Sequence, residues 1–142
     1  MREEHSHTDD MAQKGYAQSQ YGVRTRRYVQ TLTLKSTEEA ICEYRKWHSR
    51  EHMWPEIVEG IRQVGILEME IYILGRQLVM IVDAPEQWDW DEAMRRLATL
   101  PRQAEWEAFV SRFQGCSSEA TSDEKWQMMD RMFHLYKNGP SL

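Results

Sequence analysis

The sequence predicts an α+β domain in which a small antiparallel sheet is covered by helices on one face. The prediction rests on the order of the periodic segments, which runs strand, two helices, strand hairpin, two helices and a final strand. It rests also on the length of 142 residues, which suits one domain with one core. Because such a sheet needs cover on its other face as well, we expect the protein to form a homodimer.

The chain begins with a polar segment and then enters its first strand. Residues 1 to 25 show no helical or strand period, so we expect a disordered leader there, followed by the folded domain at 26–142. The leader holds His5 and His7, which we expect to be solvated. The run from Tyr28 to Leu34 is rich in β-branched and aromatic residues, which predicts a strand.

Two helices are predicted next. Ser36 and Glu39 have the spacing of a capping box, which predicts a helix from Thr37 onward. One face of this helix holds Ala40, Ile41, Tyr44 and His48. After a short break, Trp54-Pro55-Glu56 predicts the start of a second helix because proline suits a first helical turn, and Gly65 predicts its end.

The middle of the chain has the pattern of a strand hairpin. Residues 66–74 alternate between apolar and polar side chains, which predicts a half-buried strand. Residues 77–82 are more fully apolar and predict a second strand. Gly75 and Arg76 lie between the two strands and predict the turn that joins them.

Two more helices and a final strand are predicted after the hairpin. Asp89 and Glu92 have capping spacing and predict a helix, and a further helix is expected to restart at Pro101 and end at Gly115. The last segment of the chain fits a helical and a strand period equally. There we expect a short helical turn followed by a strand from about Met132.

Composition excludes several classes of function. The formal net charge of −5 argues against general nucleic-acid binding, which needs a basic face. No apolar run approaches the ~20 residues of a membrane span, and no apolar signal segment follows the N-terminus. Cys42 and Cys116 do not make a disulfide framework and fit a reducing compartment, so we expect a cytoplasmic protein.

Tyr44 and His48 are the residues best placed to carry chemistry. They lie four positions apart on a predicted helix, so the phenol and the imidazole share one side. Imidazole, with an ordinary pKa of about 6.5, is the side chain best suited to proton transfer at neutral pH. The alternative is that His48 is a half-exposed histidine favoured at the helix end by the helix dipole. A zinc pair of His48 with His52 is a weaker alternative, and we expect no metal.

Other catalytic motifs are missing, and two further patterns each allow two interpretations. The seven glycines form no phosphate-binding loop, and the chain has no nucleophile elbow. Glu68 and Glu70 share a strand face, where they are either solvated or one of them lines a site as a base. The aromatic residues, 11% of the chain, either pack in the core and the dimer interface or stack on the C–H face of a sugar.

The order of several short motifs resembles the L-rhamnose mutarotase family, which includes related L-fucose mutarotases. The resemblance covers residues 27 to 136 and rests on Tyr44-x3-His48, Trp54-Pro55-Glu56, Gly65, Ile71-Tyr72, Leu78-x-Met80 and Trp106. It implies a ferredoxin-like subunit of the dimeric α/β-barrel type. It also implies a cofactor-free isomerase that interconverts the α and β anomers of a 6-deoxy-L-hexose, L-rhamnose first and L-fucose second.

The resemblance assigns roles to individual residues. It implies that His48 is the proton donor and that Tyr44 is a substrate-binding position. We expect His48 to donate to the ring oxygen of the sugar, with Tyr44 orienting the imidazole. The substrate-binding positions that we expect are Trp54, Glu70, Tyr72, Trp106 and His52. The segment between His48 and Trp54 is longer than the family pattern, which makes His52 a rival proton donor. The general base is open between Glu70 and a water molecule.

Two other functions are alternatives to the mutarotase. One is a small dimeric monooxygenase-like or decarboxylase-like enzyme, which would change the absorbance of an aromatic substrate. The other is a non-catalytic dimeric sensor, which would bind a sugar or another small ligand without accelerating the exchange of anomers.

Overall fold

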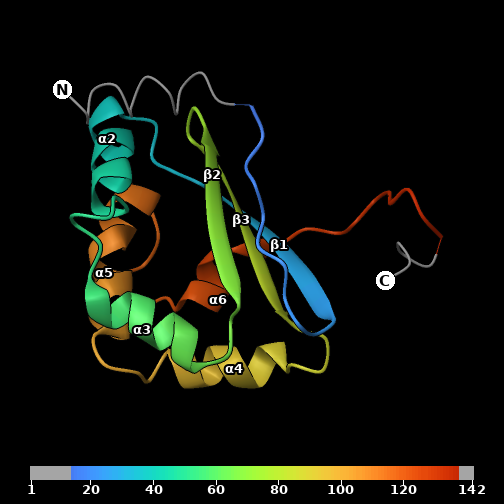
Figure 1. Cartoon of the computed structure of the whole chain (residues 1–142). Coiled ribbons are helices and arrows are strands. Elements are labelled where there is room, and N and C mark those ends of the chain that lie inside the picture. Colours follow the sequence, from blue (N-terminus) through green and yellow to red (C-terminus); the bar gives the residue numbers. More distant parts are fainter. Residues whose placement is uncertain (1–13, 138–142) are drawn as a thin grey trace.

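The structure is a computed structural model that describes residues 14–137, and these residues form one sheet with the helices on one side of it (Figure 1). The prediction of an α+β fold with helices on one face is confirmed. The elements in chain order are β1 (Thr25–Thr33), α2 (Glu38–Trp47), α3 (Pro55–Gln63), β2 (Glu68–Leu74), β3 (Gln77–Pro85), α4 (Trp90–Leu97), α5 (Gln103–Gln114), α6 (Ser122–Lys125) and β4 (Gln127–Met128).

The sheet is antiparallel throughout, with the strand order β2-β3-β1-β4. Val82 of β3 lies opposite Tyr28 of β1 and Met69 of β2, so these three side chains share one face of the sheet. The turn between β2 and β3 contains Gly75, whose φ of +61° suits glycine. The predicted hairpin is therefore confirmed.

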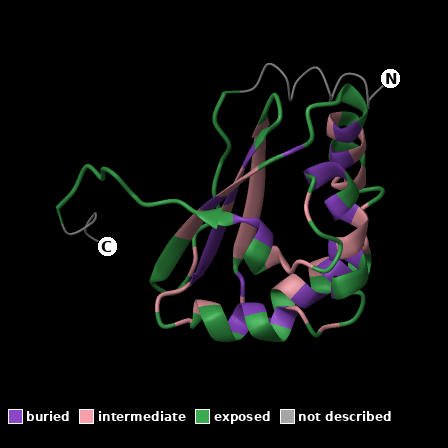
Figure 2. Cartoon of the chain, turned by 180° about the vertical axis from the view of Figure 1, so that it is seen from behind, coloured by how far each residue is buried: buried purple, intermediate pink, exposed green. Residues whose placement is uncertain are grey.

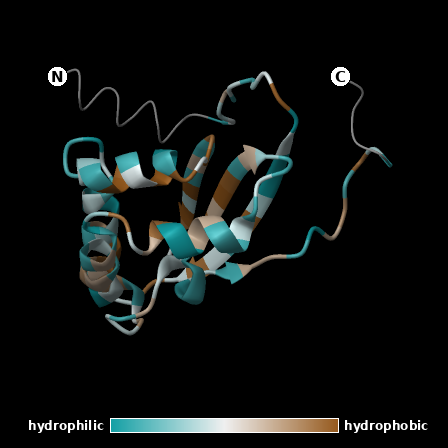
Figure 3. Ribbon diagram, turned by 90° about the horizontal axis from the view of Figure 1, so that it is seen from below, coloured by the Kyte–Doolittle hydropathy of each residue, from teal (hydrophilic) through white to brown (hydrophobic). Residues whose placement is uncertain are grey.

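The core lies between the inner face of the sheet and the helices. Alternate residues of β3 point inward, and Leu78 and Val82 are fully buried there. Ile57 of α3 and Val110 of α5 pack against the same core from the helix side. Figure 2 shows buried residues along the middle strands and the helices, and Figure 3 shows hydrophobic residues on the strands and on the helix sides that face them. None of the helices within residues 14–137 is long and apolar enough to cross a membrane.

The outer face of the sheet carries no helix in the described part of the chain (Figure 1). Instead, residues 14–24, which belong to the expected leader, run beside this face without forming a helix or strand. The ring of Tyr16 lies 5.9 Å from that of Tyr72. The side-chain amide of Gln18 donates to Glu70 over 3.1 Å. The remainder of the expected leader, residues 1–13, with His5 and His7, lies outside the described residues.

Two predicted helix boundaries are wrong. The N-cap of α2 is Thr37 rather than Ser36, because the Thr37 hydroxyl accepts from the backbone N–H of Ala40 over 3.1 Å. The helix expected to restart at Pro101 begins at Gln103, because Arg102 has a left-handed backbone with φ 64°. These local details depend on backbone angles that residue spacing does not reveal.

The final strand also differs from the prediction. It is β4, at Gln127–Met128 rather than from Met132, and it pairs with β1 only at Gln30 and Thr31. Beyond it, residues 129–137 form no helix or strand and run away from the body of the molecule (Figure 1). The alternating pattern after Met132 thus has no partner strand among the described residues.

The turn before β2 depends on Gly65. Its φ is +98°, and a Cβ atom there would lie 3.0 Å from the indole nitrogen of Trp88. The same nitrogen donates a hydrogen bond to the Val64 carbonyl over 2.7 Å, so the indole has little freedom to move away. Both the backbone angle and the space at this position therefore require glycine.

We expect Gly65→Ala to lower the free energy of unfolding by about 2–3 kcal/mol, because it combines an unfavourable φ with a contact against Trp88. The matched control is Gly75→Ala. Gly75 also has a positive φ but open space around it, so we expect Gly75→Ala to lower the free energy of unfolding by about 1 kcal/mol. Urea unfolding of both variants checks the prediction, and equal losses would contradict the role of Trp88.

Candidate active site

Two adjoining cavities lie between the inner face of the sheet and the helices. The inner cavity, of about 60 Å³, is lined among others by Tyr44, His48 and Trp106. The outer hollow, of about 360 Å³, opens beside it. The two share the residues His48, Met53, Ile61, Met69 and Ile71. His48 thus stands where a ligand in the outer hollow would meet the inner cavity.

The C-terminal end of α2 sets the orientation of the His48 ring. His48 is the C-cap of this helix, where the last carbonyl groups have no helical N–H partner. Its Nδ1 lies 2.8 Å from the backbone carbonyl oxygen of Tyr44. A carbonyl oxygen only accepts, so Nδ1 carries the proton and donates it. In the neutral ring, Nε2 is therefore the nitrogen that is free to accept a proton.

Aromatic packing holds the same ring on two sides. The ring centre of Tyr44 lies 4.1 Å from that of His48, and the ring centre of Trp106 lies 5.4 Å from it. Burial lowers the pKa of His48, and its hydrogen bond to the Tyr44 backbone only partly opposes this shift. The imidazole is therefore neutral at neutral pH, with the lone pair of Nε2 available as a base.

Trp54 supports this aromatic group. It caps α3 at its N-terminus, and its ring centre lies 5.1 Å from that of Trp106 and 5.5 Å from that of Phe109. The guanidinium of Arg102 lies 4.1 Å from the Trp54 ring centre. Trp54 does not line either cavity, whereas Trp106, which it contacts, lines the inner one.

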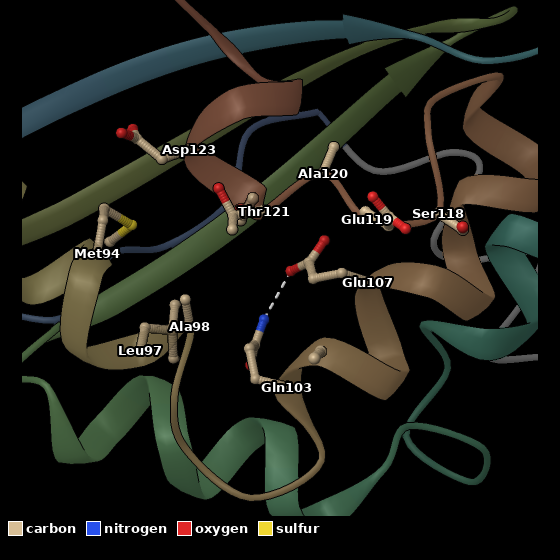
Figure 4. A pocket seen from close by; sticks show the side chains of 12 residues that line it. Met94, Leu97, Ala98, Gln103, Glu107, Ser118, Glu119, Ala120, Thr121 and Asp123 are labelled. Atoms are coloured by element: carbon tan, nitrogen blue, oxygen red, sulfur yellow. Dashed lines mark hydrogen bonds between the residues drawn. The ribbon is translucent and has the colours of Figure 1, made fainter.

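A buried polar network forms one wall of the inner cavity. The Lys125 ammonium donates to the Glu107 carboxylate over 2.9 Å, to the Glu107 carbonyl over 2.6 Å and to the Gln114 side chain over 2.9 Å. The side-chain amide of Gln103 donates to the other oxygen of the Glu107 carboxylate over 2.6 Å, which Figure 4 shows from a neighbouring hollow of about 310 Å³ that both residues also line. All four residues are buried, and these contacts replace the hydration that their polar groups have lost, except at Gln103 Oε1.

The Tyr44 hydroxyl belongs to this network rather than to the surface. It interacts with the side chain of Gln114, and the residue as a whole is buried. Burial raises the pKa of Tyr44 far above its ordinary value, more than the contact with Gln114 lowers it. The phenol therefore keeps its proton at neutral pH. Tyr44 can orient His48 and donate a hydrogen bond, but it cannot serve as a base.

The other residues singled out from the sequence lie elsewhere. His52 is exposed, with Nδ1 3.0 Å from the Ser49 hydroxyl oxygen, and it does not line either cavity. Glu70 and Tyr72 lie on the outer face of the sheet, where the Tyr72 hydroxyl donates to the Glu70 carboxylate over 2.9 Å. Because strand residues alternate in direction, it is their neighbours Met69 and Ile71 that face the helices.

Sequence reasoning missed the polar wall and the apolar lining. Gln103, Glu107 and Gln114 lie on the same side of α5 as the buried Val110, and polar residues on an apolar helix face are a signal that could have been used. No comparable signal marks Lys125, which lies in a four-residue helix. The outer hollow also has polar groups at its edge, Arg62 and Glu68, together with the apolar residues Met53, Ile61, Met69 and Ile71.

Residues 14–137 contain no group of three or more His, Cys, Asp or Glu side chains that could hold a metal ion. The polar groups that line the two cavities are an imidazole, amides, hydroxyls, carboxylates and a guanidinium. Groups of this kind transfer protons and form hydrogen bonds with hydroxyl groups.

The chain is similar in sequence to known proteins. The L-rhamnose mutarotase family matches residues 27–135. An L-fucose mutarotase of Xanthomonas campestris pv. campestris is 36% identical over 109 residues, which cover 77% of this chain and 87% of that protein. A UPF0734 protein of Dictyostelium discoideum is 31% identical over 112 residues, which cover 76% of this chain and 88% of that one.

A solved structure shares the fold. The crystal structure of an L-rhamnose mutarotase from Formosa agariphila superposes with a TM-score of 0.58 and 15% identity. The superposition covers 78% of this chain and 99% of the other. At this identity the likeness bears on the fold alone.

We expect the half-buried, neutral His48 to make stability fall in mild acid. Its pKa is lowered in the folded state and is about 6.5 in the unfolded state. Just below pH 6.5, the unfolded chain therefore binds a proton that the folded chain does not bind. The free energy of unfolding should therefore fall as the pH drops from about 7.5 to 5, and His48→Gln should reduce this fall.

Urea unfolding at several pH values checks this expectation. His52→Gln is the matched control, because His52 is exposed and its loss should leave the pH dependence unchanged. An equal pH dependence in the unmutated protein and in His48→Gln would show that the imidazole is not held neutral.

Proposed function

Because the chain belongs to the L-rhamnose mutarotase family, it is a sugar mutarotase, an isomerase that acts on carbohydrates, and we propose that its substrates are 6-deoxy-L-hexoses. The family model is described by L-rhamnose and the Xanthomonas relative by L-fucose, so these two sugars are the candidates. The observation that carries the proposal is the neutral imidazole of His48, with Nε2 free, at the junction of two cavities.

Mutarotation requires one net proton transfer. The proton of the anomeric hydroxyl moves to the ring oxygen while the bond between the anomeric carbon and the ring oxygen breaks, which leaves a free aldehyde. Rotation about the adjacent carbon–carbon bond presents the other face of the carbonyl group. Ring closure by the reverse proton transfer then forms the other anomer.

His48 can supply both halves of this transfer. Its Nε2 accepts the proton of the anomeric hydroxyl, and the resulting imidazolium then donates it to the ring oxygen. The two oxygens are bonded to the same carbon, so one nitrogen can serve both. In this scheme the donor role expected from the sequence is the second half of a shuttle that begins with His48 as the base. Glu70, on the outer face of the sheet, has no part in it.

The surroundings of His48 suit a deoxy sugar. The outer hollow, at about 360 Å³, falls in the usual size range of small-ligand sites. Met53, Ile61 and Met69 offer an apolar surface for the methyl group and the C–H face of the ring, and Arg62 and Glu68 offer hydrogen bonds to hydroxyl groups. Trp106 holds the imidazole in place, and Trp54 in turn packs on Trp106.

The working unit that we propose is a homodimer. The outer face of the sheet carries the half-buried apolar residues Val29, Val79 and Ile81 beside its polar groups. The C-terminal segment is also unusually apolar for an exposed stretch, with Met132 95% exposed and Phe133 73% exposed. A second subunit would cover both surfaces, which explains why a chain of this composition exposes them.

We place the protein in the cytoplasm. Cys42 and Cys116 are both free in the described residues, and Cys42 is exposed. Free, exposed thiols are stable where the surroundings are reducing.

We expect His48→Ala to slow the exchange of anomers by about 10²–10⁴-fold, the usual contribution of a positioned acid–base group. NMR saturation transfer between the anomer signals of L-rhamnose and of L-fucose measures this rate. His52→Ala is the matched control and should exchange anomers at the rate of the unmutated protein.

The pH dependence of the catalysed rate is a second test of the role of His48. Because the base form of His48 is required and its pKa is lowered, the catalysed rate should stay level as the pH falls to about 6.5 and decline only below it. A rate in His48→Ala equal to that of the unmutated protein would overturn the assignment of His48.

We expect deletion of residues 132–142 to convert the dimer into a monomer, because it removes the exposed apolar segment. Light scattering coupled to size-exclusion chromatography measures the mass. Deletion of residues 138–142 alone is the control and should leave the dimer intact. A monomeric full-length chain would contradict the proposed dimer.

A further inference from the structure

Gln103 holds a buried oxygen without a partner. Among the described residues, its Oε1 is the buried side-chain oxygen or nitrogen for which no hydrogen bond is found. The residue is only 4% exposed, so bulk water does not satisfy this oxygen. Buried polar atoms are nearly always hydrogen-bonded in proteins, so an unpaired one calls for an explanation.

The network around Gln103 determines which end of its amide is the oxygen. The Nε2 group donates to Glu107 Oε2 over 2.6 Å (Figure 4), and Glu107 Oε1 accepts from the Lys125 ammonium over 2.9 Å. A carboxylate paired with a lysine only accepts hydrogen bonds. A flipped amide would set two oxygens against each other, so the carbonyl oxygen must lie on the side away from Glu107.

Gln103 lines the same inner cavity as His48, and it also lines the neighbouring hollow that Figure 4 shows. Trp106, one helical turn later on α5, lines the inner cavity too and packs against the imidazole. The cavity measures about 60 Å³, and a water molecule takes about 30 Å³ in the liquid. A single hydroxyl group fits this space, whereas a whole sugar does not. The bulk of a ligand would therefore occupy the outer hollow and extend one group inward.

We propose that Gln103 is a positioning residue, whose Oε1 accepts a hydrogen bond from one non-anomeric hydroxyl group of the sugar. The inference rests on the proposed function and adds to it the atom that sets the orientation of the substrate relative to His48. The inner cavity then selects a hydroxyl donor, because a methyl group there would leave the oxygen unpaired. The methyl group of a 6-deoxy sugar must consequently face the apolar side of the outer hollow.

The test combines one variant with a panel of substrates. Gln103→Met keeps the length of the side chain and removes the acceptor. The panel contains the better substrate of L-rhamnose and L-fucose and its 2-, 3- and 4-deoxy derivatives, and NMR saturation transfer gives the kcat/KM of anomer exchange for each. In the unmutated protein the kcat/KM of one derivative should be about tenfold lower than that of the parent sugar, because this derivative leaves Oε1 unpaired.

In Gln103→Met, the kcat/KM of the parent sugar should fall by a similar factor of about ten, and the same derivative should no longer differ from the parent. This loss of discrimination at a single position is what a merely structural role would not produce. Gln63→Met, which alters an exposed glutamine of α3, is the matched control and should keep the full discrimination.

Each remaining result counts against a stated proposal. If the unmutated protein exchanges all three deoxy derivatives as fast as the parent sugar, the role of Gln103 is overturned, whether or not the variant folds. If Gln103→Met lowers every rate equally and keeps the discrimination, the residue is structural and the inference is again wrong. If the unmutated protein accelerates neither L-rhamnose nor L-fucose, the proposed function fails and the inference fails with it.

Discussion

The ion pair between Lys125 and Glu107 lies where α5 meets the C-terminal part of the chain, and the polar side of the cavity depends on it. Both charges are buried, and a buried charge is tolerated only when it is paired and its remaining hydrogen bonds are satisfied. Lys125 accordingly donates to three acceptors, and Glu107 accepts from Gln103 as well. This pair orients Gln103 and Gln114 and, through Gln114, borders the hydroxyl of Tyr44. The short helix α6 thus contributes to the site, because its first residue, Ser122, and its C-cap, Trp126, line the inner cavity and Lys125 holds the network behind the cavity wall.

The tautomer of His48 likewise follows from the need to satisfy a hydrogen-bonding group, here a carbonyl at the end of a helix. A helix end leaves carbonyl groups without partners, and the carbonyl of Tyr44 accepts from Nδ1 of an imidazole one turn later. This single bond sets the tautomer, and burial between Tyr44 and Trp106 keeps the ring neutral. A neutral ring with Nε2 directed away from the helix end is the form that can begin a proton shuttle. The same aromatic residues that stabilise the core therefore also set the protonation state of the proposed catalytic group.

The one-sided arrangement of the sheet connects the site to the rest of the molecule. Helices cover the inner face and enclose the two cavities, whereas the outer face meets residues 14–24, whose contacts include a tyrosine pair and an amide–carboxylate bond. Glu70 and Tyr72 use their hydrogen-bonding capacity on that outer face, with each other and with Gln18. The outer face thus contacts another segment of the chain, and the inner face borders the two cavities.

The amino-acid sequence by itself was enough to predict the fold class, the hairpin, the helix that begins at Pro55, and the pairing of Tyr44 with His48 on one helix side, because these depend on periodicities and spacings within a few residues. It was not enough to place Glu70 and Tyr72 relative to His48. The alternation of a strand separates its two faces, but only the packed helices decide which face is the inner one. Gln103, Glu107 and Lys125 became a network only in three dimensions, since 18 residues separate Lys125 from Glu107 along the chain. The tertiary structure alone brought these groups to the cavity that holds His48, because burial, which makes such contacts necessary, is a property of the whole fold.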